Sequence, residues 1–200
     1  MRLFPGAWIV VLLALLDGGL YAQPQPQAGT VLVTGADRGL GLEFVKQYSA
    51  AGWKVIAAAR RPEAAADLNV LAADVPGISV EQLDVTDDGS IAALSAKYRG
   101  QPIDVLIDNA GVLGDARAQQ LGSLGRAEFE EVMGVNVFGA LAVADAFREH
   151  VAASRQKKIV AITSRSGILS QPGWRGPYFY RASKVALNMS MKMLAEELRG

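Results

Sequence analysis

TVLVTGADRGLG, residues 30–41, is the stretch that decides the fold. Its first five residues, Thr30–Thr34, are apolar or β-branched and predict a buried strand. The glycines Gly35, Gly39 and Gly41 follow at once, in a turn that opens a helix. Such a turn lets the backbone approach a pyrophosphate, which then lies at the positive end of the helix. The stretch predicts a nucleotide-binding loop after the first strand of a sheet, although glycines alone also fit a purely structural turn.

Short apolar runs alternate with longer amphipathic segments along the rest of the chain. Strands are expected at residues 30–34, 54–59, 78–83, 103–107 and 158–163, and helices at residues 40–51, 62–73, 87–98, 126–151 and 178–198. Asp87 is placed to cap the third of these helices. This alternation implies parallel strands joined by right-handed crossovers, with helices on both faces. The prediction is a Rossmann-type, doubly wound α/β domain of about five strands over residues 30–200.

The composition excludes several classes of chemistry. Among 200 residues, 20 basic side chains balance 20 acidic ones, so the sequence has no electrostatic footprint for nucleic acid. There is no cysteine, and the single histidine, His150, is expected at the surface. Disulfides, thiolate catalysis and metal sites built from these residues are therefore not expected. Any chemistry has to come from hydroxyls, lysine, carboxylates or an organic cofactor.

The first 22 residues have the layout of a secretory signal peptide. Arg2 precedes an apolar run at residues 7–16, and a possible cleavage point follows Ala22. The run is short for a bilayer, so no stable membrane span is expected. Residues 23–29 begin with QPQPQ and are expected to form a linker. A signal peptide implies export to the periplasm or the exterior, whereas an uncleaved apolar leader or a misassigned start codon implies a cytoplasmic protein.

Further motifs follow the glycine loop at regular distances. They are Asp84-Val85, Asn109-Ala110-Gly111, Asn136, Ser164, Tyr180 and Lys184. With the Thr-Gly-x-x-x-Gly-x-Gly loop, this set resembles the short-chain dehydrogenases/reductases over residues 30–198; sugar-nucleotide epimerases, with a differently spaced loop, fit less well. The resemblance implies a nicotinamide cofactor held by Thr34, Gly35, Asp37, Arg38, Gly39, Leu40, Gly41, Arg60, Asp84, Val85, Asn109, Ala110, Gly111, Tyr180 and Lys184. One departure is Asp108, where the family usually has asparagine or an apolar residue.

The end of the second predicted strand favours NADP(H) over NAD(H). An NAD site normally has an acid here for the ribose 2′-hydroxyl. This chain has Arg60 and Arg61 instead, and Arg38 lies in the glycine loop. A guanidinium suits a 2′-phosphate, so Arg60 and Arg38 are the expected partners. The alternative is that the arginines after the strand are only solvated charges.

Tyr180 and Lys184 are four residues apart and therefore share one face of a helix. A phenol, with a pKa of about 10, is a weak acid–base catalyst at neutral pH, and a neighbouring ammonium favours its phenolate. The resemblance implies that Tyr180 exchanges a proton with the substrate oxygen, that Ser164 rather than Ser166 binds this oxygen, and that Asn136 holds a relay water. The expected reaction is hydride transfer between NADP(H) and a carbonyl or alcohol. A chance surface pair is the alternative for Tyr180 and Lys184.

The sequence stops directly after the helix that carries Tyr180. Members of the resembled family continue with two more strands and a segment that covers the substrate, so the chain is expected to be a fragment or a shortened product. The fifth strand would then lie at a sheet edge. A catalytically weak nucleotide-binding or scaffold protein is therefore the alternative function. The last helix is also the expected contact of a homo-oligomer.

Overall fold

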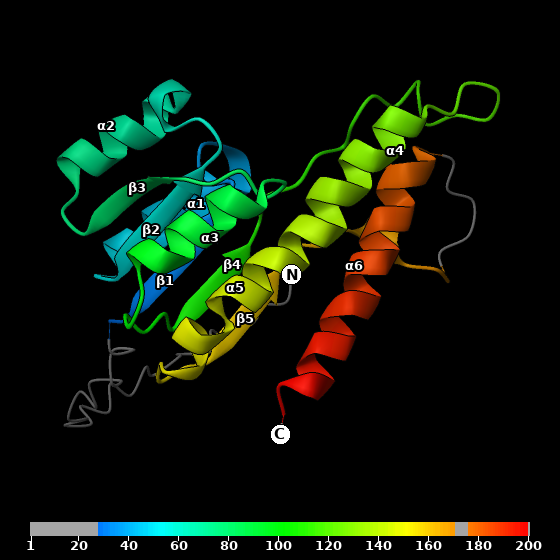
Figure 1. The fold of residues 1–200 in the computed structure, drawn as a ribbon. Helices are drawn as coiled ribbons and strands as arrows, with labels where there is room; N and C mark the ends of the chain where they lie inside the picture. The colour runs from blue at the N-terminus through cyan, green and yellow to red at the C-terminus, as the bar shows by residue number, and fades with distance from the viewer. Residues whose placement is uncertain (1–27, 171–175, 200) are drawn as a thin grey trace, which may run out of the picture.

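A computed structural model describes residues 28–170 and 176–199, and they form one parallel sheet with helices on both faces (Figure 1). The strands are β1 (Thr30–Thr34), β2 (Lys54–Ala59), β3 (Ile78–Gln82), β4 (Val105–Asp108) and β5 (Lys158–Ala161). Their order in the sheet is β3-β2-β1-β4-β5, and every neighbouring pair is parallel. The predicted fold class is confirmed. The predicted leader at residues 1–22 and most of the linker lie outside the described residues.

The helices divide between the two faces of the sheet. They are α1 (Gly39–Ala50), α2 (Ala66–Asp74), α3 (Asp88–Lys97), α4 (Arg126–Met133), α5 (Ala140–Ala152) and α6 (Tyr178–Glu197). Side chains alternate along each strand, so Val31 and Val33 pack in a core with α1 and α2, whereas Leu32 packs with α3 and α5. Asp87 caps α3 as predicted, accepting hydrogen bonds from Gly89 and Ser90 backbone nitrogens.

The long helix expected over residues 126–151 is interrupted by a π turn. α4 passes through η2 (Gly134–Gly139) into α5, and the three make one rod with α6 beside it (Figure 1). Hydrophobic spacing does not reveal a π turn, because the apolar positions stay roughly three to four residues apart on both sides of it. The turn contains Asn136, so this departure from the prediction falls at the candidate site.

Other differences lie at element ends. The helix expected over residues 62–73 is a 3-10 turn, η1 (Pro62–Ala64), followed by α2. The fourth strand begins at Val105 rather than at Ile103, and the fifth ends at Ala161. β5 lies at the edge of the sheet, as expected, and Val160 is 40% exposed. Within the described residues, no helix is both long and apolar enough to cross a membrane.

The prediction that His150 lies at the surface is wrong. The residue is buried on α5, where its ring packs against Phe147. Its two ring nitrogens lie 3.3 Å from Ser95 Oγ and 3.2 Å from the backbone oxygen of Gln101. Charged neighbours in the sequence suggested exposure, but hydrogen bonds from α3 and the loop after it satisfy the buried ring. His150 is therefore a polar member of the packing between α3 and α5.

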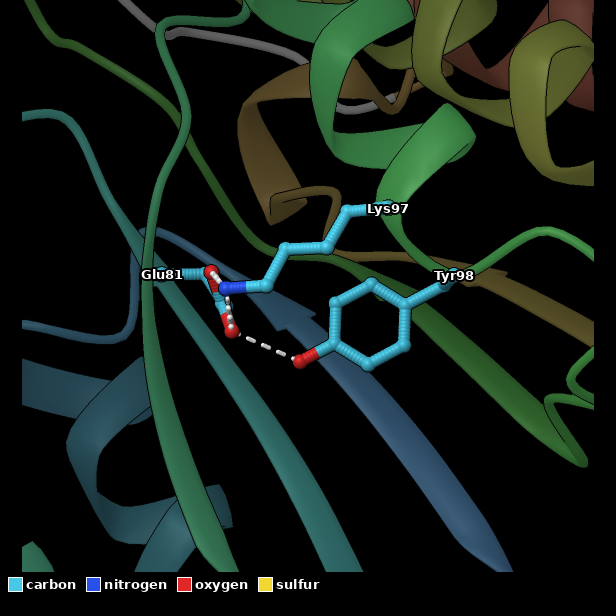
Figure 2. A network of polar contacts seen from close by, with 3 residues as sticks. All are labelled: Glu81, Lys97 and Tyr98. Atoms are coloured by element: carbon cyan, nitrogen blue, oxygen red, sulfur yellow. Dashed lines mark hydrogen bonds and ion pairs between the residues drawn. The ribbon is translucent and has the colours of Figure 1, made fainter.

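The opposite edge strand, β3, is tied to α3 by a buried carboxylate (Figure 2). Glu81 accepts hydrogen bonds from Lys97 Nζ at 2.6 and 2.8 Å and from the Tyr98 hydroxyl at 2.7 Å. Burial, together with this carboxylate, raises the pKa of Tyr98, so its hydroxyl remains a donor. The network fixes β3, whose carboxyl end leads directly to Asp84.

Candidate active site

The site lies where the crossovers leave the sheet in opposite directions, at the carboxyl ends of β1 and β4. Ligands of doubly wound sheets bind at this point. Asn109 follows β4, and its Nδ2 donates to the backbone oxygens of Thr34 and Gly35, both at 3.0 Å. Thr34 Oγ1 in turn accepts from the backbone nitrogens of Asn109 and Ala110, both at 3.0 Å. Thr34 is 1% exposed, so its side chain shapes the loop from beneath.

The glycine loop is packed tightly against this Asn109 loop. Gly35 has a φ of +62°, and an added Cβ would lie 2.9 Å from Ala110 Cα. At Gly41 an added Cβ would collide with the backbone oxygen of Gly35 and would lie 2.6 Å from Asn109 Nδ2. Gly39, by contrast, has open space around it and a φ of +55°. Each glycine is thus required by contact or by backbone conformation.

The amino end of α1 fits the phosphates of a dinucleotide. Its first turn holds no acidic residue, and no side chain caps it at Arg38. The backbone N–H groups of a first helical turn have no partner within the helix and carry partial positive charge. Gly35 and Gly41 contribute no side chain to the loop below them. The residues present therefore fit a pyrophosphate group.

Two cavities of about 350 and 200 Å³ adjoin this loop. The larger is lined by Gly35, Asp37, Arg38, Leu40, Asn109, Ala110, Gly111, Val112, Leu113, Ile162, Thr163, Tyr180 and Lys184. The smaller is lined by Gly35, Asp37, Arg38, Arg60, Arg61, Ala64, Leu83, Asp84, Val85, Ala110, Gly111, Val112 and Val135. Of the predicted site residues, the ones that line neither cavity are Thr34, Gly39, Gly41, Asn136 and Ser164. Gly35, Asp37, Arg38 and residues 110–112 are common to both cavities.

The smaller cavity is the arginine-rich end. Arg60 and Arg38 both line it together with Asp84. Partial burial works against the Asp84 carboxylate, but hydrogen bonds from Thr86 and the charge of Arg60 outweigh it and lower the pKa of Asp84. The carboxylate accepts at 2.9 Å from the Thr86 nitrogen and at 2.7 Å from its hydroxyl. The side chain is therefore ionised and fixed in place beside the cavity.

The larger cavity holds the predicted acid–base pair. Lys184 is only 6% exposed, and its Nζ donates to the backbone oxygen of Ile162 at 2.9 Å. This nitrogen lies 5.8 Å from the centroid of the Tyr180 ring. Burial lowers the pKa of Lys184 from its usual value. The two side chains share one face of α6 and border the same space, as their spacing predicted.

Asn136 braces the wall of this cavity. Its Oδ1 accepts from the Val112 nitrogen, and its Nδ2 donates to the Val112 oxygen, both at 2.8 Å. Nδ2 also donates to Ser183 Oγ at 3.0 Å. At Gly111 an added Cβ would lie 3.2 Å from Asn136 Oδ1 and 3.6 Å from Lys184 Nζ. The side chain is thus committed to protein contacts, and the relay water remains a prediction.

Ser164 follows β5 and is half-buried. Its Oγ accepts from the Ser166 nitrogen at 3.1 Å, at the start of the 3-10 turn η3 (Arg165–Gly167). Thr163, beside it, lines the larger cavity and donates to Asn188 Oδ1 at 2.7 Å. Because the Ser164 hydroxyl proton is not used in accepting from Ser166, it is available to a ligand. The role of Ser164 remains a prediction.

Sequence reasoning missed several residues around this site. They are Val112, Leu113, Gln119, Ile162, Thr163 and Ser183. Ser183 lies inside the Tyr-x-x-x-Lys motif, at a position that the motif leaves open. Gln119 lies in a loop without regular spacing, so no pattern marked it. The adjacency of Ile162 and Thr163 to Ser164 was the one available signal for those two residues.

Asp108 is a buried carboxyl at the carboxyl end of β4. It is 4% exposed, and neither carboxyl oxygen has a hydrogen-bond partner. Burial therefore raises the pKa of Asp108 well above its ordinary value. Asn109 next to it keeps all of its contacts, as expected.

Comparison with known proteins places the chain in a family. A family model described as short chain dehydrogenase matches residues 29–200. A short-chain dehydrogenase/reductase of Arthrinium is 35% identical in an alignment of 181 positions that covers 84% of this chain and 68% of the relative. The chain therefore belongs to the short-chain dehydrogenases/reductases, as its motifs predicted. It spans about half to two thirds of the length of the curated relatives it matches.

Solved structures agree with this assignment. An NADPH-bound carbonyl reductase from chicken fatty liver is 32% identical, with a TM-score of 0.76, and the match covers 86% of this chain and 75% of that one. A short-chain dehydrogenase/reductase from Burkholderia multivorans with bound NADP is 25% identical, with a TM-score of 0.74, covering 85% and 73%.

Proposed function

We propose that this chain carries the NADP(H) site and the proton-transfer groups of a carbonyl reductase or alcohol dehydrogenase. The observation that carries the proposal is the shared cavity. Tyr180 and the buried Lys184 border the space that begins at the glycine loop. A dinucleotide with its phosphates at the start of α1 would thus have one end beside a phenol and an ammonium.

When bound, NADPH supplies a hydride to the carbonyl carbon of the substrate. The protein has to bind the carbonyl oxygen and deliver a proton to it. In the reducing direction, Tyr180 donates its hydroxyl proton to that oxygen, and in the oxidising direction its phenolate takes the proton back. The ammonium of Lys184 favours the phenolate because it is buried close to the Tyr180 ring.

Ser164 and Asn136 complete the proposed catalytic set. The hydroxyl proton of Ser164 is free to stabilise the negative charge that develops on the substrate oxygen. Asn136 connects Val112 to Ser183 in the first turns of α6. We propose that a water held beside Asn136 relays protons between solvent and Lys184.

The proposed choice of NADP(H) rests on Arg38 and Arg60, which line the smaller cavity together with Asp84. β2 ends in alanine and not in an acidic residue. The double variant Arg38→Ala/Arg60→Ala is expected to weaken NADPH binding about 100-fold and NADH binding less than threefold, because only NADPH carries the 2′-phosphate. Quenching of protein fluorescence measures both dissociation constants. Arg126→Ala, on an exposed helix surface, is the matched control. Equal losses for the two cofactors would remove the NADP(H) assignment.

A panel of ketones and aldehydes, followed by NADPH absorbance, tests the chemistry. Tyr180→Phe removes only the transferable proton, so turnover is expected to fall at least 100-fold while NADPH still binds. Tyr178→Phe, two residues earlier and half exposed, is the control and should keep wild-type turnover. NADPH binding without turnover in the wild type would favour the alternative, a nucleotide-binding or scaffold protein. Equal turnover in wild type and Tyr180→Phe would exclude Tyr180 as the acid.

We also propose that the chain associates with itself through α6. Exposed apolar side chains on this helix support the proposal, since Met189 and Met193 are 58% and 57% exposed. Sedimentation of wild type against Met189→Lys/Met193→Lys tests it. A monomeric wild type would refute it.

Residues 1–22 are proposed to direct export. The apolar run and the small residues before position 23 support this proposal. N-terminal sequencing of protein recovered from separated cell fractions tests it. Cleavage after Ala22 in an exported fraction is the expected result, and an intact leader in the cytoplasmic fraction would contradict it.

A further inference from the structure

Gln119 is a fully buried polar side chain outside every motif of the family. It lies in the loop between β4 and α4 and has 0% exposure, which places it among the largest completely buried residues described. A buried amide is retained only if its donors and acceptor are satisfied. Its partners therefore indicate what it holds in place.

Those partners join the loop to the catalytic helix. Gln119 Oε1 accepts from the backbone nitrogen of Tyr180 at 2.8 Å. Its Nε2 donates to the backbone oxygens of Leu113 at 2.8 Å and Asp115 at 3.3 Å. The backbone oxygen of Gln119 accepts from the Tyr178 nitrogen at 3.3 Å. Every polar group of the side chain is thus engaged at once.

The bond to Tyr180 satisfies a helix end. α6 begins at Tyr178, and Pro177 before it supplies no side-chain cap. The N–H groups of the first turn lack partners within the helix, so each needs an acceptor from elsewhere. Gln119 provides that acceptor at the residue that carries the catalytic phenol. The sequence distance between the two residues, 61 positions, is why local cap rules do not reveal it.

Tyr180 is also held from its other backbone group. Ser183 Oγ donates to the Tyr180 oxygen at 2.8 Å, and Asn136 donates to Ser183 Oγ. Asn136 is bonded in turn to Val112, which adjoins Leu113. Both backbone groups of Tyr180 therefore lead, by separate routes, to the segment that lines the larger cavity.

We propose that Gln119 is a positioning residue that fixes the phenol of Tyr180 relative to the cavity wall at Val112 and Leu113. The inference rests on the proposed function of Tyr180. Catalytic rates depend steeply on such placement, because a misplacement of about 1 Å costs roughly 100-fold. The hydrogen bonds of the Gln119 side chain go to Leu113, Asp115 and Tyr180 and not to the glycine loop or Arg60. NADPH affinity should therefore not depend on it.

The first test uses Gln119→Met, which keeps the length of the side chain and removes all three hydrogen bonds. Its kcat is expected to fall about 10- to 100-fold, with the dissociation constant of NADPH unchanged within about twofold. Gln120→Met, the exposed neighbour, is the control and should match wild type. A kcat equal to that of the control would overturn the proposal, and so would a parallel loss of NADPH binding, which indicates general unfolding.

The conservative variant Gln119→Glu separates positioning from packing. Protonated, the introduced carboxyl accepts from Tyr180 and donates to Leu113, as the amide does. Ionised, it faces the Leu113 and Asp115 backbone oxygens without a proton to donate to them, and it lies close to the carboxylate of Glu128. The kcat of the variant should approach that of wild type at acid pH and fall as pH rises. Its pH profile should therefore contain a descending limb that the wild-type profile lacks. A profile parallel to that of wild type would overturn the proposal.

Hydrogen exchange at the Tyr180 amide distinguishes failure of this inference from failure of the proposed function. Gln119→Met should increase the exchange rate of this amide at least 10-fold, whether or not the protein turns over substrate, and Gln120→Met should not. If the wild type is inactive but Gln119→Met still speeds exchange of the Tyr180 amide, the proposed function is refuted and the positioning contact is retained. Unchanged exchange would refute the positioning contact itself.

Discussion

Lys184 Nζ lies 5.8 Å from the centroid of the Tyr180 ring, and its hydrogen bond goes to the backbone of Ile162 rather than to the phenol. The lysine is thus held by the residue that directly follows β5, while its charge remains near the ring. This arrangement places a buried ammonium next to the proposed proton donor without occupying the hydroxyl that has to reach substrate. The catalytic effect that we propose for Lys184 is therefore electrostatic.

Lys184→Met is expected to lower carbonyl reduction by about 100-fold or more, because the charge that favours the phenolate is lost. The thermal midpoint should not fall, since methionine fills the space and removes a desolvated charge. Lys192→Met, two turns later on the exposed side of α6, should leave both quantities unchanged. A purely structural Lys184 would instead show lower stability with rate constants near those of wild type.

Gly41→Ala is expected to raise the dissociation constant of NADPH at least 10-fold. The added methyl would collide with the Gly35 backbone and push against Asn109, so the glycine loop and the Asn109 loop would have to separate. Gly134→Ala is the control, because a Cβ there meets nothing within 4 Å. Fluorescence titration measures the NADPH affinity of both variants. Equal affinities would contradict the prediction, because they would show that the loop accommodates a methyl group at position 41.

Asp108 predicts an unusual dependence of stability on pH. Its folded pKa is raised, so the native state holds a proton that the unfolded chain releases above about pH 3.9. This contribution to stability is fully present below the unfolded pKa and is lost as pH rises through the folded pKa. Asp108→Asn should therefore flatten the decline of the urea midpoint as pH rises above about 4. Asp145→Asn, at an exposed position, should keep the wild-type slope; an equal slope in Asp108→Asn would contradict the assignment.

Tyr98→Phe should lower the free energy of unfolding by about 1–2 kcal/mol, because it removes the buried hydrogen bond to Glu81. Lys97→Met should cost less than about 1 kcal/mol, since its side chain is 61% exposed. Tyr48→Phe, which keeps the ring contact with Trp53, is the control for loss of a tyrosine hydroxyl. Urea denaturation measures all three, and a larger loss for Lys97→Met than for Tyr98→Phe would reverse the assigned importance.

The sequence alone was sufficient for the sheet and for the glycine turn between β1 and α1, because both depend on local patterns. β1 and the glycines after it combine strand periodicity with a turn that only small residues permit. The Tyr180 and Lys184 pair followed from helical spacing. In each of these cases the physical constraint acts within a few residues, so it leaves a readable signature.

Features that depend on distant contacts were not predictable in the same way. His150 was placed at the surface because its neighbours are charged, whereas partners from α3 and the following loop allow its burial. Gln119 left no signature, since its purpose is a bond to a helix 61 residues away. Asp108 was noticed as a departure, but its lack of partners depends on the packing around β4.

The π turn at Gly134–Gly139 sets the angular phase of everything that follows it along the rod. An α-helix advances about 100° per residue and a π turn holds one residue more per turn, so the same residues wound as a regular α-helix would rotate α5 by roughly 100°. Val143 and Phe147, both now fully buried, would turn away from the strands. A regular helix would thus remove these side chains from the sheet, so the π turn at Asn136 is required for α5 to pack on the strands.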